Sequence, residues 1–261
     1  MNFKTKNLLI ALLSIAFFLN ISRGFAQQFK ALLFTRTVGY HHASIHEGVD
    51  AMRKLADRHT FSLDWQENPN VFNDKALANY DVVIFLNTTG DVLNEEQQKA
   101  FEKFIQSGKG YVGIHSASDT EYDWAWYTKL VGRMFKIHPP TQTAVLNVKD
   151  SNFPGMELIP QKWLWTDEWY QYGEEKITGL NYLLTVDEKT FDVYAKWGDN
   201  EGKGMGDFHP IAWYHNYDGG RAFYTGLGHV PGTYSDPIFL QHLYGGIYWA
   251  VTGKGIANKT K

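Results

Sequence analysis

Residues 110–118 read Gly-Tyr-Val-Gly-Ile-His-Ser-Ala-Ser and indicate the architecture more directly than any other stretch. The apolar run predicts a buried strand that ends at His115, followed by small residues, as at a strand-to-turn junction in an open α/β sheet. Gly113 to Ala117 has the outline of a nucleophile elbow, where a tight turn projects one side chain beyond the carboxyl end of a strand. The elbow position holds an imidazole here. His115 is therefore either the centre of a site or a satisfied histidine at a strand end.

Strands and helices alternate on the amino-terminal side of this stretch. Apolar runs predict strands at Phe29–Phe34, Phe61–Trp65 and Asp81–Leu86, and the last is apolar enough for burial on both faces. Ser44-x-x-Glu47 matches a capping box at the start of one helix, and Asn94 is a candidate cap for a second. With right-handed crossovers, the alternation predicts an α/β fold: a doubly wound, mostly parallel, flavodoxin-like sheet with helices on both faces.

The carboxyl-terminal part is less regular. Pro210–His215 and Arg221–Leu227 read as a strand pair joined by a turn, and the Gly-rich segment Asp199–Asp207 reads as a surface loop. Asp236-Pro237 has the cap and first-turn residues of a last helix. No repeat or low-complexity linker interrupts the chain, so we expect residues 27–261 to form a single domain.

The first 26 residues have the pattern of a signal peptide. Lys4 and Lys6 precede an apolar stretch too short to span a bilayer, and Gly24-Phe25-Ala26 is a small-x-small cleavage site. We expect cleavage after Ala26, no stable membrane insertion afterwards, and a periplasmic or secreted protein. The alternative is an uncleaved anchor. The absence of cysteine excludes disulfides, thiolate chemistry and a lipid attached at a cleavage-site cysteine.

The composition limits the classes of molecule that the protein is expected to bind. Removal of the leader, which carries three basic and no acidic residues, moves the net charge from −3 to −6. No basic run remains that could follow a phosphate backbone, so nucleic acid is not an expected partner. Aromatic residues make up 16% of the chain, which suits either a large core or a carbohydrate site whose rings pack against sugar faces.

Several candidate proton carriers or ligands fall at predicted loops or strand ends; these are His42, His115, His138, Glu168 and His229. Converging at one edge of a parallel sheet, such side chains could perform acid–base chemistry or hold a divalent metal such as zinc. No local metal motif favours the second role. Ser116 and Ser118 allow a serine–histidine arrangement on paper, but adjacent residues on a tight turn rarely face each other.

Two acidic residues, Asp167 and Glu168, lie among large aromatic residues in the run 163–170. If the aromatic rings remove the carboxylates from water, the pKa values of both carboxyl groups should rise. The alternative is an exposed acidic turn flanked by core aromatics.

Five motifs in order resemble the ThuA-like, or trehalose-utilisation, family over about Phe29 to Thr252. They are Gly39-Tyr-His-His42-x-Ser44, Gly113-Ile-His-Ser-Ala117, Gly132-x-x-Phe135-x-x-His138-Pro139, Asp167-Glu168-x-Tyr170 and Gly220-Arg-Ala-Phe-Tyr-x-x-Leu-Gly-His229. The resemblance implies a class I glutamine amidotransferase-like fold. His115 stands where true amidotransferases have the elbow cysteine, so glutamine hydrolysis is not expected.

The resemblance further implies a role in carbohydrate catabolism, with keto-glycosides or disaccharides as substrates and no nucleotide cofactor. We expect a lyase, isomerase or hydrolase with catalytic residues His115, Glu168 and His229. Expected substrate contacts are His42, Trp169 and Tyr170, and the expected ligands of a metal, if one is bound, are His115, His138 and His229. The alternatives are a non-catalytic glycan-binding module and a zinc-dependent hydrolase of another substrate. A small carbohydrate is the expected ligand, and the sequence carries no signal of oligomeric state.

Overall fold

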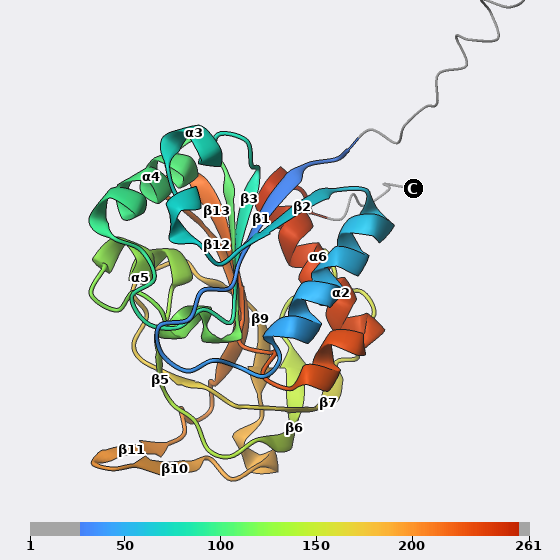
Figure 1. Cartoon of the computed structure of the whole chain (residues 1–261). Helices are drawn as coiled ribbons and strands as arrows, with labels where there is room; N and C mark the ends of the chain where they lie inside the picture. The colour runs from blue at the N-terminus through green and yellow to red at the C-terminus, as the bar shows by residue number, and fades with distance from the viewer. Residues whose placement is uncertain (1–26, 256–261) are drawn as a thin grey trace, which may run out of the picture.

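A nine-stranded mixed sheet forms the centre of the computed structural model, which describes residues 27–255 (Figure 1). The strand order is β2-β1-β3-β4-β13-β12-β9-β6-β7. The first half is parallel and comprises β1 (Lys30–Phe34), β2 (Ser62–Gln66), β3 (Val82–Leu86), β4 (Gly110–Ile114) and β13 (Gly220–Thr225). All residues of β3 and β4 are buried, as their apolar sequences predict.

The second half of the sheet is antiparallel, so the sheet as a whole is mixed and its parallel strands lie in the first half. It comprises β12 (Pro210–Tyr217), β9 (Asn181–Val186), β6 (Gln142–Val148) and β7 (Lys162–Asp167). Two small sheets flank it: β5 (Phe135–Ile137) with β8 (Gln171–Tyr172), and β10 (Tyr194–Trp197) with β11 (Asn200–Lys203). The pairing of β12 with β13 confirms the strand pair predicted from sequence.

Helices cover both faces of the sheet, and Figure 1 shows α2 and α6 on one side and α3, α4 and α5 on the other. Their bounds are α2 (Ile45–His59), α3 (Asp74–Leu77), α4 (Glu95–Gln106), α5 (Ala125–Val131) and α6 (Pro237–Thr252). Short 3₁₀ turns are η1 (Pro69–Val71), η2 (His115–Asp119), η3 (Glu188–Thr190) and η4 (Pro231–Ser235). Within residues 27–255, none of the helices is both long and apolar enough to cross a membrane.

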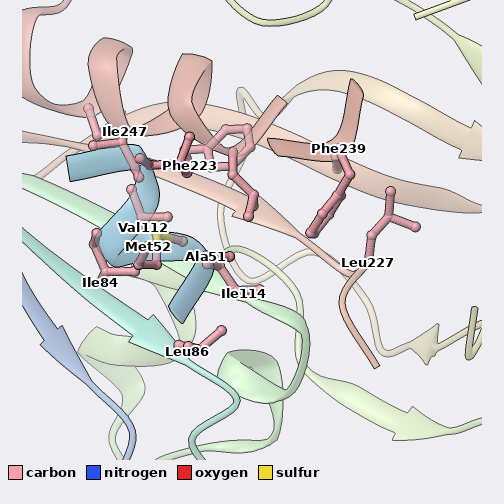
Figure 2. Close-up of a cluster of buried hydrophobic side chains, with 14 of the residues drawn as sticks. Ala51, Met52, Ile84, Leu86, Val112, Ile114, Phe223, Leu227, Phe239 and Ile247 are labelled. Carbon is pink, nitrogen blue, oxygen red and sulfur yellow. The ribbon is translucent and has the colours of Figure 1, made fainter. Parts of the chain in front are cut away.

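Each face of the sheet has its own apolar core. On the α2/α6 side, Ile84, Val112 and Phe223 from adjacent strands pack with Met52 of α2 and Ile247 of α6 (Figure 2). On the other face, aromatic residues of β3, β4 and α4 predominate. Because both layers are fully packed, the sheet is held rigidly, and loops at its carboxyl edge are positioned by a fixed scaffold.

Two local predictions at helix starts have different outcomes. Asn94 caps α4 as expected, with Gln97 completing a reciprocal capping box. Ser44 lies at the N-cap position of α2 but makes no capping hydrogen bond, so the capping box predicted there is wrong. Its hydroxyl instead donates to the Gly228 carbonyl, 3.0 Å away.

One predicted loop is also wrong in part, because residues 200–203 within the segment Asp199–Asp207 form β11. The hairpin of β10 and β11 packs against the β5/β8 sheet at Gly202. A larger residue would clash there, since a Cβ would lie 2.5 Å from Ile137. The predicted leader, residues 1–26, lies outside the described residues.

Candidate functional site

The elbow predicted at residues 113–117 is present. Strand β4 ends at Ile114, and His115 starts η2 with a φ of 51°. A positive φ is uncommon for any residue except glycine and is held only where the surrounding structure enforces it. Close packing around Gly113 helps to enforce this backbone conformation, because a Cβ there would lie 2.8 Å from the Tyr111 hydroxyl oxygen. The turn therefore projects the imidazole of His115 beyond the end of the strand.

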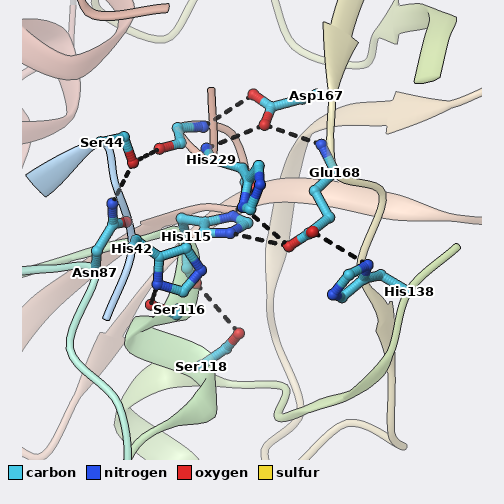
Figure 3. A network of polar contacts seen from close by, with 12 residues as sticks. His42, Ser44, Asn87, His115, Ser116, Ser118, His138, Asp167, Glu168 and His229 are labelled. Carbon is cyan, nitrogen blue, oxygen red and sulfur yellow. Dashed lines mark hydrogen bonds and ion pairs between the residues drawn. The ribbon is translucent and has the colours of Figure 1, made fainter. Parts of the chain in front are cut away.

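Three further side chains meet this imidazole at the carboxyl edge of the sheet (Figure 3). His42, His115, Glu168 and His229 each offer one ligand atom, and these atoms all lie within 4.8 Å of one another. The histidines follow the parallel strands β1, β4 and β13, whose carboxyl ends meet at one edge, while Glu168 follows β7. The convergence of the three histidines, predicted from their positions after these strands, is confirmed.

The hydrogen bonds of His115 define its tautomer. Its Nδ1 lies 2.8 Å from the carbonyl oxygen of Gly226. Since a carbonyl only accepts, Nδ1 carries a proton and donates it. The other nitrogen, Nε2, is fully buried, makes no hydrogen bond and lies 3.4 Å from the Glu168 carboxylate. In a neutral ring, Nε2 would point a lone pair at a carboxylate. A cation held between the two groups would remove this repulsion.

Glu168 connects the cluster to a fourth histidine. Its Oε2 faces His115 and lies 3.1 Å from Nδ1 of His229, while Oε1 lies 3.2 Å from Nδ1 of His138. The Nδ1 of His138 also donates to the Pro139 carbonyl at 2.8 Å. Glu168 is only 6% exposed, so the predicted alternative of an exposed acidic turn is wrong.

The environment sets opposite protonation preferences in the cluster. Burial raises the pKa of Glu168, but contacts with His115 and His229 outweigh burial and lower that pKa well below its usual range. The predicted rise in the Glu168 pKa is therefore wrong. Burial, reinforced by the charges of His115 and His229, lowers the pKa of His42 to about 2. Burial also lowers the pKa of His229, but Glu168 reverses the effect and raises it. At neutral pH the site thus combines an ionised carboxylate with a neutral imidazole.

A set of backbone contacts fixes the loop that carries His229. The Asp167 carboxylate accepts hydrogen bonds from the backbone N–H groups of Gly228 and His229 at 2.9 and 3.0 Å. On the other side, Asn87 donates to the Ser44 hydroxyl at 2.8 Å, and this hydroxyl in turn donates to Gly228. Sequence reasoning did not assign this role to Ser44 or Asn87. The signal for Asn87 was its place directly after β3, at the same edge of the sheet.

The cluster opens into a cavity of about 400 Å³, a size suited to a small ligand. Its lining consists of Tyr40, His42, Asp119, Phe135, His138, Glu168, Tyr170, Trp197 and His229. A larger cavity of about 580 Å³ lies between α2 and α6, but none of the cluster residues line it. We therefore place the site at the smaller cavity, where the polar groups converge.

The predicted residues are not all placed as expected. Tyr170 lines the cavity, but Trp169 is fully buried in the core, donates to the Gln142 carbonyl and does not line the cavity. The prediction that Trp169 contacts the substrate is therefore wrong. His138 lies outside the group of potential metal ligands, which includes His42 and Glu168 instead. Sequence reasoning did not assign the cavity residues Tyr40, Asp119, Phe135 and Trp197 to the site, although Tyr40 and Phe135 lie within two of the five motifs.

Comparisons with known proteins agree on one family. A model of the ThuA family, described as trehalose utilisation, matches residues 30–250. A solved structure from Bacteroides uniformis, described as ThuA-like, is 24% identical with a TM-score of 0.72, and the match covers 88% of this chain and 94% of that one. A ThuA-like structure from Parabacteroides merdae is 22% identical with a TM-score of 0.66, covering 87% and 91%. The cytoplasmic protein STM3548 from Salmonella typhimurium is 10% identical with a TM-score of 0.56, covering 85% and 98%. No curated protein matches the sequence.

Proposed function

Because the chain belongs to the ThuA, or trehalose-utilisation, family, we propose that it is an enzyme that acts on keto-glycosides or keto-disaccharides by acid–base chemistry. The observation that carries the proposal is the meeting of His42, His115, Glu168 and His229 at one end of a cavity of ligand size. A buried carboxylate among imidazoles provides proton acceptors and donors within one site. The aromatic rings around it suit a sugar better than a charged ligand.

The proposed reaction is a β-elimination that uses the acidity beside a ketone. In a glucoside oxidised at C3, a base removes the proton from C2, and the C–H electron pair forms a C1–C2 double bond. The bond between C1 and the glycosidic oxygen breaks, and its electron pair leaves on that oxygen, which takes up a proton. This elimination needs no oxidant or reductant. Glu168 is ionised at neutral pH and lines the cavity, so we assign it the role of base.

The same residues fit a divalent metal such as zinc. His115 donates its Nδ1–H to a backbone carbonyl and leaves Nε2 free. A metal-binding histidine usually makes such a hydrogen bond through the ring nitrogen that does not bind the metal. The neutral state of His42 and the ionised state of Glu168 are those that metal binding requires. We propose His42, His115, His229 and one carboxylate oxygen of Glu168 as the ligands, with the other oxygen, Oε1, left to accept the substrate proton. A bound ion would stabilise negative charge on a substrate oxygen as a Lewis acid.

Trp197 supports the sugar-binding part of the proposal. The ring is 45% exposed at the cavity, and it meets His138 edge-on with ring centroids 4.6 Å apart. An exposed tryptophan beside a polar site offers a flat surface for the apolar face of a sugar ring. Trp197→Ala should therefore raise KM for a 3-keto glucoside roughly tenfold, equivalent to about 1.4 kcal/mol of binding, with little change in kcat.

Steady-state kinetics test this prediction, and Tyr194→Ala is the matched control. Tyr194 is an exposed aromatic residue on the same strand, but it does not line the cavity. If both variants have wild-type KM values, Trp197 is not a sugar contact.

A substrate panel tests the proposed function against its alternatives. The enzyme should release the aglycone from a 3-keto glucoside and leave the unoxidised glucoside intact, because only the ketone acidifies the neighbouring C–H. A glycan-binding module would bind both compounds, as measured by calorimetry, and turn over neither. A zinc-dependent hydrolase would instead cleave simple esters or amides and ignore the 3-keto glucoside.

We also propose that the protein is exported, as its basic and apolar amino-terminal sequence indicates. Amino-terminal sequencing of protein from the native host should find a chain that starts at Gln27. An intact Met1 in the membrane fraction would contradict export with cleavage.

A further inference from the structure

We propose that Asp119 is a second catalytic carboxyl group of this cavity and donates the proton that the departing glycosidic oxygen takes up. The inference rests on the proposed function, which needs a proton donor as well as a base. Asp119 is the last residue of η2, the turn that starts at His115, and it lines the same cavity as Glu168. Of the residues that line this cavity, these two carry carboxyl groups.

Asp119 is chemically separate from the histidine cluster. Glu168 is surrounded by imidazoles, whereas Asp119 lies outside the group of potential metal ligands. The side-chain hydrogen-bond partner of Asp119 is Tyr122, whose hydroxyl oxygen lies 2.7 Å from Oδ1. The carboxyl group of Asp119 is therefore available for a role that Glu168, held by histidines, cannot fill at the same time.

The Tyr122 hydroxyl can accommodate Asp119 in both protonation states. This hydroxyl carries one proton but has two acceptors in reach: Oδ1 of Asp119 at 2.7 Å and the Phe135 carbonyl at 2.8 Å. When Asp119 is ionised, Tyr122 donates to the carboxylate. When Asp119 is protonated, it can donate to Tyr122, which then donates to Phe135. A carboxyl group whose partner fits both states can give up a proton and recover it.

The electrostatic setting agrees with this geometry. Burial raises the pKa of Asp119, and the effects of Tyr122 and His115 only partly oppose burial. For Glu168, by contrast, the imidazoles outweigh burial and lower the pKa. The pKa values of these two carboxyl groups in one site move in opposite directions. This is the pattern expected for an acid and a base. Tyr170 and Tyr224 also lie close enough for their own pKa values to respond to the Asp119 charge.

The backbone around Asp119 is held in place. Its carbonyl accepts from the Gly90 N–H at 2.9 Å, and the next residue, Thr120, donates from its hydroxyl to the Ser116 carbonyl at 3.1 Å. Glu121 follows with its carboxylate accepting from the N–H groups of Val92 and Leu93. The carboxyl group of Asp119 is therefore presented from a rigid turn, which a proton donor needs for alignment.

The test compares two leaving groups in the full-length mature protein. Asp119→Asn should lower kcat for methyl 3-keto-glucoside, whose alkoxide needs a proton to leave, by roughly 10²–10⁴-fold. For the 4-nitrophenyl analogue, whose phenolate leaves unaided, kcat should fall by less than about tenfold. Zinc content and melting temperature should match the wild type, because Asp119 is not in the cluster. Asp123→Asn is the control, because Asp123 is an exposed aspartate four residues further along the chain that does not line the cavity.

Several outcomes would overturn the assignment. An equal loss on both substrates would make Asp119 a structural residue, and no loss on either would remove it from the reaction. If Asp119→Asn fails to fold, Tyr122→Phe provides the same comparison, and it should slow the methyl substrate more than the 4-nitrophenyl one. A wild-type protein that turns over neither substrate would refute the proposed function itself, and this assignment with it.

Discussion

Replacing Glu168 with glutamine should lower turnover of a 3-keto glucoside by roughly 10²–10⁴-fold, the usual contribution of a positioned general base. The amide has nearly the same shape as the carboxyl group but cannot accept the substrate proton. Glu168 is also the group that faces His115, His138 and His229, so the substitution removes the negative charge in direct contact with these imidazoles. Turnover measured with the methyl and 4-nitrophenyl substrates should fall alike, because proton removal precedes departure of either leaving group.

The control for this variant is Glu174→Gln, which changes an exposed carboxylate a few residues further along the chain. It should have wild-type turnover and wild-type zinc content. If Glu168→Gln keeps more than about a tenth of the wild-type kcat, proton abstraction belongs to another group. A large rise in KM with kcat unchanged would instead assign Glu168 to substrate binding.

Replacing His115 should remove both turnover and bound metal. The preferred substitution is His115→Asn, because asparagine tolerates the positive φ of 51° better than most residues. With the Nε2 ligand gone, we expect zinc, measured by inductively coupled plasma mass spectrometry, to fall well below the wild-type content. We expect turnover to fall by at least roughly a hundredfold, as for other lost acid–base or ligand groups.

His46→Asn is the matched control, since this imidazole is exposed on the first turn of α2. The control should keep both metal and turnover. If His115→Asn loses turnover but keeps its metal, the role of His115 is proton transfer. If it is fully active, or fails to fold while His46→Asn is normal, His115 is a structural residue.

The burial of His115 bears on the stability of its variants. An exposed histidine at the rim of a sheet would contribute at most about 1 kcal/mol to stability. The His115 side chain is instead fully buried, and Nδ1 donates to the Gly226 carbonyl. Its removal leaves that carbonyl without its donor, so His115→Ala should destabilise the fold more than a rim residue would.

The parallel half of the fold could be predicted from sequence largely because β1, β3 and β4 are short apolar runs, each followed by a helix or helical turn. The same reasoning placed His42, His115 and His229 at one edge, since parallel strands bring their carboxyl ends together. The antiparallel half was harder to predict. Strands such as β6 and β7 alternate buried and exposed positions irregularly, and β11 is a polar, Gly-containing segment without a strand pattern.

The rest of the site depends on contacts between distant segments. Asp119, Tyr40 and Trp197 reach the cavity from η2, from the loop after β1 and from the end of β10, and no local spacing links them to Glu168. The predicted direction of the Glu168 pKa shift was wrong for the same reason. Neighbouring aromatic residues suggested a raised pKa, whereas imidazoles from other strands lower it. Trp169 was misplaced because an aromatic residue beside a catalytic carboxylate can turn either to the cavity or to the core.

Exchange at C2 of the substrate tests whether Glu168 removes the C2 proton. We would incubate the mature wild-type protein and Glu168→Gln with a 3-keto glucoside in D₂O and follow the C2 proton by nuclear magnetic resonance. The wild-type protein should replace the C2 proton with deuterium or eliminate the aglycone, and Glu168→Gln should do neither at a comparable rate. A wild-type protein that binds the sugar but leaves its C2 proton in place would rule out the proposed elimination.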